Sequence, residues 1–427
     1  MKKIAIGILG LGTVGSGVVK LLQDNAQKIK DITGCELNVK TVVVRDLNRK
    51  RDVELKDIKL TDDVNEVLKD DEIKIVVEVM GTIEPAKEYI TKALEAKKHV
   101  VTANKDLIAQ HGSKLSEIAR KNNCDLFYEA SVAGGIPILR TIDNSFAADQ
   151  IQAVLGIVNG TTNFILTQMT KSGLSYDEAL KLAQEKGFAE ADPTNDVAGK
   201  DAAYKMIILT QFAFGKDISI SDVKLEGIQN VTANDIKEAK NLGYTIKLLG
   251  IAKLIEEKLD VSVGPVLVPN AKPLAAIQDE NNAVLVRGQA VGETLFYGPG
   301  AGELPTANSV LSDIIAVTKD IVLETTGRRF NSYVNQLELA DPDKITYSYY
   351  FSLRLADRPG QMLKLTEIMA SENASFDTIK QTGSKDGKAQ VLVVTHALSE
   401  TQLNKIKEKL AKEDEVTLLA AYKVLEG

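Results

Sequence analysis

The strongest constraint on the fold is a buried-strand pattern that runs directly into a glycine triplet near the N-terminus. Residues 4–9 read Ile-Ala-Ile-Gly-Ile-Leu, and Gly10-Leu-Gly-Thr-Val-Gly15 follows at once. In a Gly-x-Gly-x-x-Gly turn, the first glycine allows a tight bend, the second lets backbone approach a pyrophosphate, and the third lets the next helix pack closely. The helix N-terminus adds amide donors and a positive dipole. The pattern predicts a dinucleotide site built by Gly10, Gly12, Thr13, Val14 and Gly15.

The first 140 residues alternate short apolar strands with helices, which predicts a Rossmann-type, doubly wound parallel sheet in the α/β class. We expect strands over 73–80 and 98–102. Ligands of such sheets collect at the carboxyl ends of the strands. Gly81, Thr82 and Lys105 follow those ends, so they are candidates for contact with a nicotinamide cofactor.

A strand expected from residue 38 ends at Arg45 and Asp46, where the adenosine ribose of a bound cofactor would lie. An arginine there accommodates the 2′-phosphate of NADP, whereas a carboxylate favours NAD. Arg45 comes first and further cations follow at residues 49–51, so the sequence favours NADP. Asp46 keeps NAD open, and a merely solvated basic loop is the alternative interpretation.

Composition excludes several other classes of protein. The net charge of −7, with basic residues spread among acids, argues against a nucleic-acid partner. No apolar run approaches the ~18 residues that span a bilayer. Cys35 and Cys124 are isolated, which indicates a reducing compartment, and we expect a cytoplasmic protein without thiolate metal clusters. The three histidines show no metal-ligand spacing, so lysine becomes the candidate for proton transfer.

Residues 190–205 are the segment richest in candidate chemistry. Glu190, Asp196 and Asp201 crowd acids into a stretch that enters a helix expected over 200–213. Lys205 follows Asp201 by four residues, so both share one helical face. The acids suit a cationic substrate and the lysine suits proton transfer. A solvated ion pair is the alternative, but the apolar continuation Met-Ile-Ile-Leu after Lys205 places this helix in a core, where an idle pair is costly.

The rest of the chain divides into a middle and a C-terminal part. In residues 141–304 the regular alternation of short strands and helices ends. This part predicts a mixed α+β domain for catalysis and oligomerisation, with β-rich segments over 247–268 and 283–292. Residues 298–309 form a glycine-rich loop expected to open a helix over 310–321. In the functional interpretation, Gly302 covers the cofactor as residues 305–335 return to the nucleotide domain; a plain connector is the alternative.

Residues 348–427 follow a polar linker over about 336–346 and have their own order of elements. Strand, helix, strand, strand, helix and strand alternate there, with turns at Asp357–Gly360 and Asp386–Gly387. This βαββαβ order predicts a ferredoxin-like fold. The segment carries no nucleophile or phosphate loop, so small-ligand sensing or subunit contact is the better expectation than catalysis.

Together these residues resemble the homoserine dehydrogenase family over residues 1 to about 335. The motifs that carry the resemblance are Gly10 to Gly15, Ala103 to Gly112, Gly156 to Thr167 and the segment from Ala183 to Lys205. Residues 348–427 resemble an ACT domain, an amino-acid-sensing module. Because no aspartate kinase segment precedes the glycine turn, the chain looks like the monofunctional form. Gln361–Met362 departs from the Val/Ile-Leu that is commoner after the ACT turn.

The resemblance implies NAD(P)H-dependent interconversion of L-aspartate 4-semialdehyde and L-homoserine, with NADP or NAD as cofactor. By the match, Lys205 exchanges the proton with the carbonyl oxygen, Asp201 orients it, and Lys105 lies beside the nicotinamide. Glu190 and Asp196 would bind the substrate ammonium, and Thr161 or Thr162 the substrate carboxylate or the nicotinamide carboxamide.

Family members also bind a monovalent cation, Na⁺ or K⁺, in the segment from residue 129 to 136. The match gives Glu129 and the backbone carbonyls of Val132, Gly134 and Ile136 as its ligands, and a structural glycine turn is the alternative. The resemblance further implies a homodimer or homotetramer, and L-threonine as an effector that acts through subunit packing.

Two other functions stay open from the sequence. Another Rossmann amino-acid dehydrogenase would turn over a different 2-amino acid without strict need of Lys205. A non-catalytic, cofactor-binding amino-acid sensor is supported by the ACT-like tail alone.

Overall fold

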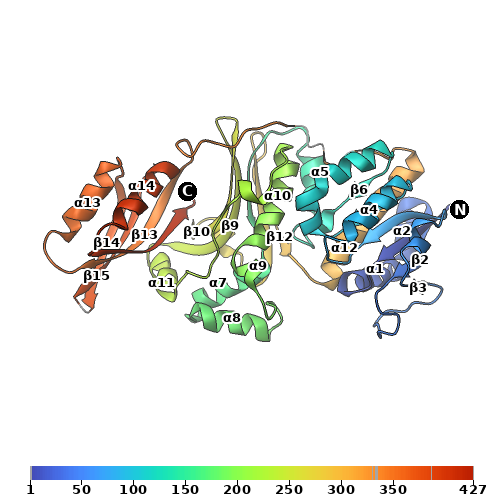
Figure 1. Ribbon diagram of the computed structural model, residues 1–427, viewed down its shortest axis with the longest axis horizontal. Helices are drawn as coiled ribbons and strands as arrows, with labels where there is room; N and C mark the ends of the chain where they lie inside the picture. The colour runs from blue at the N-terminus through green and yellow to red at the C-terminus, as the bar shows by residue number, and fades with distance from the viewer. Residues whose placement is uncertain (1, 329, 332–334, 386, 427) are drawn as a thin grey trace. The chain divides into compact units, whose positions relative to one another are not determined.

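The computed structural model describes residues 2–328, 330–331, 335–385 and 387–426, in two compact units (Figure 1). The first unit comprises residues 1–154, 204–221 and 282–336. The second comprises residues 155–203, 222–281 and 337–427. Each unit thus gathers three stretches that are distant in the sequence.

The first unit is built on a sheet of six parallel strands in the order β3-β2-β1-β4-β5-β6. This is the Rossmann strand order, so the predicted doubly wound fold is confirmed. Its strands are β1 (Lys2–Leu9), β2 (Cys35–Val43), β3 (Lys59–Thr61), β4 (Ile73–Glu78), β5 (His99–Thr102) and β6 (Leu126–Phe127). The helices among them are α1 (Thr13–Asp24), α2 (Ala26–Thr33), α3 (Asn65–Leu68), α4 (Ala86–Glu95), α5 (Lys105–Lys121) and α6 (Ile138–Ser145), with the short 3₁₀ turn η1 (Glu129–Ser131).

The central strands of this sheet are apolar on both faces. Residues 4–9 of β1 are all buried, as are Val76 and Val77 of β4 and Val100 and Val101 of β5. Such continuous apolar runs are typical of parallel strands that helices cover on both sides. The strand core therefore follows directly from the sequence pattern.

One later helix packs on α1 of this unit. α12 (Glu303–Leu323) lies against α1 so closely that a Cβ on Gly17 would stand 2.9 Å from the Cβ of Ala307. Lys20 of α1 also forms a 2.7 Å ion pair with Glu303. The helix expected over 310–321 was wrong at its start by seven residues, because Pro305 fits the first turn of a helix, where no backbone N–H is needed. Strands β11 (Asn281–Gly288) and β12 (Gly292–Pro299) precede it.

The second unit combines helices with a mixed sheet. β9 (Tyr244–Ile255) and β10 (Lys258–Pro269) form a long antiparallel hairpin, and β8 (Lys224–Leu225) pairs with β10. Its helical elements are α7 (Gly160–Ser172), α8 (Tyr176–Glu185), α9 (Thr194–Val197), α11 (Ala233–Asn241) and the 3₁₀ turn η3 (Pro273–Ala276). The chain passes between the units within β7 (Ile151–Ile157) and α10 (Lys200–Phe214), and again near η2 (Ile220–Asp222) and at the start of β11.

The C-terminal part of the second unit has the predicted βαββαβ order. Its elements are β13 (Thr346–Ala356), α13 (Gln361–Ser371), β14 (Phe376–Lys385), β15 (Lys388–Thr395), the short β16 (Leu398–Ser399), α14 (Glu400–Leu410) and β17 (Val416–Val424). The strands lie in the order β17-β13-β15-β14, and Figure 1 shows α13 and α14 on the same side of them. The ferredoxin-like prediction is confirmed. The predicted turn at 386–387 falls partly outside the described residues, since Asp386 is not among them.

The sheet of this C-terminal part is continuous with the hairpin of the same unit. β17 pairs in parallel with β10, with Val266 opposite Lys423 and Leu267 opposite Val424. The buried hydroxyl of Tyr347 also donates to Asp260 of β10 at 2.8 Å. The C-terminal part is therefore joined to the hairpin by strand pairing and by a buried hydrogen bond.

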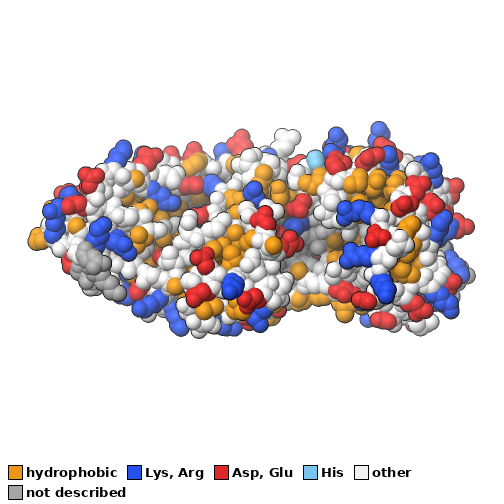
Figure 2. Space-filling model, turned by 60° about the horizontal axis from the view of Figure 1, so that its bottom comes forward, with side chains coloured by type: hydrophobic (Ala, Val, Ile, Leu, Met, Phe, Trp, Pro, Cys, Tyr) orange, Lys and Arg blue, Asp and Glu red, His pale blue; other side chains and the backbone are white. Residues whose placement is uncertain are grey.

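The surface carries charges of both signs. Figure 2 shows lysine and arginine side chains interspersed with aspartate and glutamate over the visible face. Among the described residues, no helix has both the length and the apolar character needed to cross a bilayer.

Candidate active site

The glycine turn after β1 has the geometry that its three glycines predict. Gly10 has φ of +101°, and a Cβ there would stand 2.9 Å from the carbonyl oxygen of Val79. A Cβ on Gly15 would stand 2.3 Å from the oxygen of Gly10, whereas a Cβ on Gly12 would meet nothing within 4 Å. The open backbone at Gly12 and the start of α1 at Thr13 leave room and amide donors for a diphosphate. These residues fit a dinucleotide.

Polar side chains organise the carboxyl ends of β4 and β5. Glu78 is fully buried and accepts hydrogen bonds from Thr102 Oγ1 at 2.6 Å and from the amide of Met80 at 2.7 Å. Burial raises the pKa of the Glu78 carboxyl. Because β4 and β5 are parallel neighbours, the hydrogen bond from Thr102 to Glu78 joins the ends of both strands at the edge where ligands of Rossmann sheets collect.

Asn104 positions two of the predicted cofactor residues. Its Nδ2 donates to the carbonyl oxygen of Thr82 at 2.6 Å, and its Oδ1 caps α5 by accepting from the amide of Leu107 at 3.2 Å. Lys105 is the first residue of that helix. Thr82 and Lys105 are thus brought to the same edge of the sheet by one buried amide.

The end of β2 carries the residues predicted to distinguish the two nucleotides. Arg45 is exposed just beyond the strand. The carboxylate of Asp46 accepts from the amide of Asn48 at 2.9 Å, and its backbone oxygen accepts from Arg51 at 2.6 Å. The Asp46 carboxylate is therefore engaged by its own loop, while the Arg45 guanidinium faces solvent.

Two further predicted cofactor residues lie at chain turns. Gly81 has φ of +75° in the segment after β4, a conformation that L side chains rarely adopt. Gly302 has φ of +127° and is the residue before the first turn of α12. Contact of Gly81 and Gly302 with the cofactor stays a prediction.

A hydrogen-bonded cluster in the second unit joins two of the predicted acids. Asn159 is buried between β7 and α7, and its Nδ2 donates to Asp196 Oδ1 at 2.7 Å and to Asp201 Oδ2 at 2.8 Å. Its Oδ1 accepts from the amide and hydroxyl of Thr162 at 2.8 and 2.7 Å, which caps α7. One side chain therefore fixes the start of α7 and holds the two carboxylates together.

Thr161 and Glu190 differ in their relation to this cluster. The Thr161 hydroxyl lies 2.6 Å from the carbonyl oxygen of Phe188 and 3.3 Å from Asp196. Glu190 is exposed between α8 and α9, and its carboxylate makes no hydrogen bond among the described residues. Thr161 thus belongs to the cluster, whereas Glu190 lies outside it with its charge available. Their roles in substrate binding stay predictions.

Asp201 and Lys205 both lie in α10, as expected, and the helix bounds match the predicted 200–213 within one residue. Asp201 is in the first turn, where a carboxylate is stabilised by the helix dipole. Lys205 follows one turn later, beside the buried Met206. The buried apolar residues 206–209 pack in the core and fix the position of the helix. The polar residues of its first turns are thereby fixed in position as well.

The predicted cation segment is tied to a buried charged cluster in the first unit. The two carboxylate oxygens of Glu129 each accept at 2.8 Å from the amides of Leu139 and Arg140, at the start of α6. Asp313 of α12 accepts from the Glu129 amide at 2.9 Å and pairs with Arg140. Complete burial raises the pKa of Asp313 to about 8, and burial also raises the pKa of Glu129.

The predicted cation ligands keep lone pairs beside these hydrogen bonds. Each carboxylate oxygen of Glu129 accepts one hydrogen bond from an amide at the start of α6, so it can still face a cation. The oxygen of Gly134 accepts from Ser309 at 2.6 Å and that of Ile136 from the amide of Ile138 at 2.8 Å, and each carbonyl keeps a second lone pair. Over the described residues, no group of three His, Cys, Asp or Glu side chains has metal-site geometry.

Several residues that organise these sites were missed by sequence reasoning. Asn159 stands in a motif that was recognised, Asn-Gly-Thr-Thr-Asn, but its double contact depends on a loop 37 to 42 residues away. Asn104 showed the usual signal of a helix cap and could have been found. Asp313 gave no local signal, because a single aspartate in an apolar helix is not distinguishable from a surface residue.

Comparison with known proteins agrees with this geometry. Residues 10–129 match the family model "Homoserine dehydrogenase, NAD binding domain", residues 137–315 match "Homoserine dehydrogenase", and residues 349–415 match "ACT domain". Homoserine dehydrogenase of Bacillus subtilis is 48% identical over 412 residues, which cover 96% of this chain and 95% of the relative. That of Lactococcus lactis is 43% identical and covers 99% of both chains.

Solved structures give the same result. A homoserine dehydrogenase from Thiobacillus denitrificans superposes with a TM-score of 0.94 at 37% identity, covering 100% of this chain and 99% of the other. One from Staphylococcus aureus gives 0.80 at 38% identity, with 100% and 99% covered. These similarities decide against the two alternative functions, a different dehydrogenase and a non-catalytic sensor. The chain belongs to the homoserine dehydrogenase family and is an NAD(P)-dependent oxidoreductase that interconverts L-aspartate 4-semialdehyde and L-homoserine.

Proposed function

We propose that Lys205 is the residue that gives a proton to the aldehyde oxygen of L-aspartate 4-semialdehyde and takes it back in the reverse direction. The nicotinamide, when bound, supplies or accepts the hydride. Asp201 stands one turn before Lys205 on α10, so its carboxylate orients the ammonium and keeps it charged. Lys105, the first residue of α5, polarises the reacting oxygen as a second cation. A positioned acid of this kind contributes about 100-fold or more to turnover.

Substrate recognition is assigned to the acids before α10. Glu190 and Asp196 pair with the substrate ammonium, since a cation removed from water requires an anion beside it. Thr161 contributes a hydroxyl lone pair near Asp196, because its hydroxyl donates its proton to the Phe188 carbonyl oxygen. The exposed carboxylate of Glu190 supports this role, because it has no hydrogen-bond or ion-pair partner among the residues that the structure describes.

The observation that carries the proposal is the double hydrogen bond of Asn159. It joins Asp196, from the substrate-binding stretch, to Asp201, from the helix of the proton donor, with contacts of 2.7 and 2.8 Å. The two carboxyl groups therefore lie at one centre, where oxygen atoms could receive the ammonium of a substrate.

We further propose that the cofactor is held by the glycine turn, with NADP preferred. Gly10, Gly12, Thr13, Val14 and Gly15 hold the diphosphate, Gly81, Thr82 and Gly302 line the nucleotide, and Arg45 binds the 2′-phosphate. Exposure of Arg45 and engagement of Asp46 by its own loop favour NADP over NAD. Residues 1–140 with 305–335 then form the cofactor domain, 141–304 the catalytic and oligomerisation domain, and 348–427 the regulatory domain.

Three more features complete the proposal. Na⁺ or K⁺ binds Glu129 and the backbone oxygens of Val132, Gly134 and Ile136. The functional enzyme is a homodimer or homotetramer. L-Threonine binds away from the active site and inhibits, through the ACT domain.

The decisive experiment compares wild type with Lys205→Ala in NADPH- and NADH-dependent reduction of aspartate semialdehyde. We expect kcat to fall at least about 100-fold while the KM for the nucleotide stays within a few-fold. Lys200→Ala, on the exposed first turn of the same helix, is the matched control and should retain turnover. Retention of activity by Lys205→Ala within a few-fold would remove this residue from the mechanism.

A further inference from the structure

A carboxyl group without a cationic partner is buried at the C-terminal end of β4 in the first unit. Glu78 is the last residue of that strand, and 0% of its surface is exposed. It forms no ion pair with any other residue that the structure describes. Removing a carboxylate from water is costly, so a charge in this position needs compensation from hydrogen bonds or from a cation.

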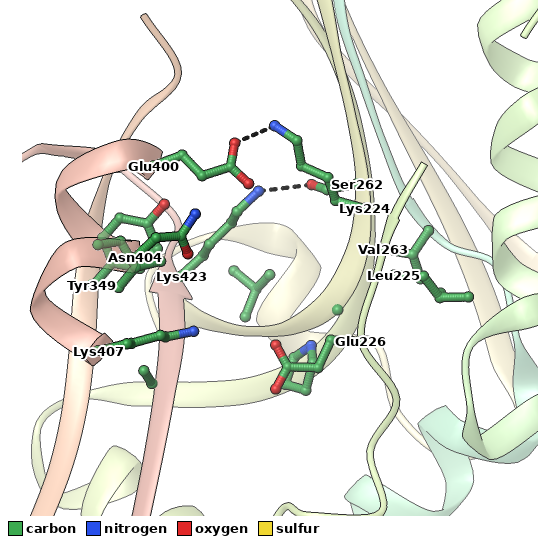
Figure 3. A pocket seen from close by; sticks show the side chains of 15 residues that line it. Lys224, Leu225, Glu226, Ser262, Val263, Tyr349, Glu400, Asn404, Lys407 and Lys423 are labelled. Carbon is green, nitrogen blue, oxygen red and sulfur yellow. Dashed lines mark hydrogen bonds and ion pairs between the residues drawn. The ribbon is translucent and has the colours of Figure 1, made fainter. Parts of the chain in front are cut away.

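Other acids with little exposure do have a cation. Asp313 pairs with Arg140 in the first unit. In the second unit Glu400 pairs with Lys224, and Figure 3 shows the two side chains pointing toward each other. Glu78 differs from these acids because the described part of the chain places no opposite charge against it.

The hydrogen bonds of Glu78 fit the ionised form of the side chain. Its Oε1 accepts from the amide of Met80 at 2.7 Å, and its Oε2 accepts from Thr102 Oγ1 at 2.6 Å. The Thr102 hydroxyl oxygen accepts from the amide of Asn104 at 3.0 Å, so its own proton is directed to Glu78. An O–H···O contact of this length is typical of a charged acceptor. Burial raises the pKa of Glu78, and the donors act in the opposite direction.

Glu78 also organises the two segments that carry predicted nicotinamide contacts. Met80 leads into Thr82, and Asn104 precedes Lys105 at the start of α5. Asn104 joins the two segments, because its Nδ2 donates to the carbonyl oxygen of Thr82 at 2.6 Å. The carboxylate therefore belongs to the edge of the sheet at which Rossmann folds bind their ligands.

The same segment packs against the first glycine of the nucleotide turn. A Cβ on Gly10 would stand 2.9 Å from the oxygen of Val79 and 3.3 Å from the nitrogen of Met80. That nitrogen belongs to the amide that donates to Glu78. One turn of backbone thus separates the carboxylate from the glycine turn. Because the charge is buried, water and salt screen its field only weakly.

The reaction changes the charge of the nicotinamide ring by one unit. Reduction of the aldehyde takes one hydride, with its two electrons, from the dihydronicotinamide and one proton from the proposed donor Lys205. A C–H bond of the ring breaks, and a C–H and an O–H bond form on the substrate. The ring becomes a cation, whereas the phosphates of the nucleotide keep their charges. A fixed anion nearby stabilises this positive charge as it develops.

We propose that Glu78 is a fixed anion that stabilises the positively charged, oxidised nicotinamide over the neutral, reduced one. The oxidised ring is the cation that the fold does not place against this carboxylate. Glu78 thereby biases the bound cofactor toward its oxidised form and favours loss of hydride from the reduced form. The inference rests on the proposed placement of the nicotinamide beside Thr82 and Lys105.

The test measures the dissociation constants of NADP⁺ and NADPH for the full-length protein by isothermal titration calorimetry. The ratio of the two constants cancels the contacts that both nucleotides share, so it reports the charge of the ring. Glu78→Gln keeps the shape of the side chain and removes its charge. We expect the Kd of NADP⁺ to rise about tenfold, while the Kd of NADPH stays within about twofold of wild type.

Matched variants separate the charge from the structural role of the side chain. Thr102→Val removes a hydrogen bond to Glu78 and keeps the charge, so it should leave the ratio at the wild-type value. Glu88→Gln removes an exposed carboxylate of α4 and should leave both constants unchanged. Partial unfolding lowers both affinities alike, so the ratio stays informative for a destabilised variant. Equal weakening of NADP⁺ and NADPH by Glu78→Gln would show a structural role and overturn the proposal.

Lys105→Gln distinguishes this inference from the placement on which it rests. Loss of a cation beside the ring should lower the Kd of NADP⁺ relative to that of NADPH, opposite to the effect of Glu78→Gln. A changed ratio in Lys105→Gln with an unchanged ratio in Glu78→Gln would overturn the role of Glu78 and leave the placement intact. An unchanged ratio in both variants would overturn the role and the placement together.

Discussion

Replacing Asn159 by aspartate should convert the centre of the polar cluster from a donor into a third negative charge. In the wild type, the amide nitrogen lies 2.7 Å from Asp196 Oδ1 and 2.8 Å from Asp201 Oδ2. The aspartate can still cap α7, because Asp and Asn are equally good at that position. The change therefore isolates electrostatics from helix capping.

The size of the effect follows from the distances. If the carboxylates relax to about 4 Å, each like-charge pair costs about 4 kcal/mol at an effective dielectric constant of about 20. The substitution adds two such pairs, so the repulsion raises the carboxyl pKa values of the cluster and favours a shared proton over three charges. A protonated acid can then donate one O–H in place of the lost amide.

The sign of the pH dependence is fixed by the direction of this shift. A carboxyl pKa raised in the folded state contributes stability that is complete below the unfolded-state pKa, about 4, and is lost as pH rises through the folded-state pKa. Asn159→Asp should thus become less stable across that range, relative to Asn159→Ser. Its kcat/KM for homoserine should fall most steeply above about pH 7, because the charged cluster repels itself and displaces Asp201.

Asn159→Ser is the matched control, since serine also caps helices but cannot bridge the two carboxylates. It loses two hydrogen bonds to charged acceptors, each worth about 1.5–3 kcal/mol, and we expect kcat/KM to fall about 10- to 100-fold with little added pH dependence. The assay is homoserine oxidation from pH 5.5 to 9, with thermal melts at each pH. Identical pH profiles for the two variants, or wild-type activity in Asn159→Asp, would refute the reasoning.

Three other predictions test separate parts of the structure. Gly12→Ala should have the melting temperature of wild type and raise the KM for the nucleotide about tenfold or more. Gly15→Ala should destabilise the fold by about 1–3 kcal/mol, because its Cβ would stand 2.3 Å from a backbone oxygen. Equal melting temperatures of the two variants would contradict this. Arg45→Ala should raise the KM for NADPH about tenfold with little change for NADH, and an equal effect on both nucleotides would remove Arg45 from 2′-phosphate recognition. Lys247 is buried and its pKa is lowered to about 8. Between pH 8 and 10.5 the free energy of unfolding of wild type, measured by urea titration, should therefore rise relative to that of Lys247→Met by up to about 3 kcal/mol. If the unfolding free energies of both proteins change with pH in parallel, a buried, titrating amine is excluded.

The structure also bears on how the regulatory domain should be tested. Deleting residues 348–427 would remove β17 from the edge of β10, with which it pairs at Val266 and Leu267. The exposed edge of β10 would destabilise the hairpin, and Tyr347, which donates to Asp260, would lose the rest of the strand that holds it. A truncated enzyme thus tests folding together with feedback.

Much of the fold was determined by local sequence patterns. The run from Ile4 to Gly15 predicted both the first strand and its glycine turn, because strand periodicity and positive-φ glycines are properties of neighbouring residues. The βαββαβ order of the ACT domain and the bounds of α10 followed in the same way. Motifs with short internal spacing also carried the family resemblance that the comparisons confirmed.

What the sequence left undecided depends on contacts between distant residues. The start of α12 was mistaken because Pro305 resembles a helix breaker unless the first turn is known. The bridge from Asn159 to Asp196 and Asp201, and the hydrogen bond from Thr102 to Glu78, exist only where the chain folds back on itself. The propensity for a helix, strand or turn depends on neighbouring residues and can be predicted from one stretch of sequence. Contacts between charged or polar groups that are distant in the sequence depend on tertiary packing and cannot.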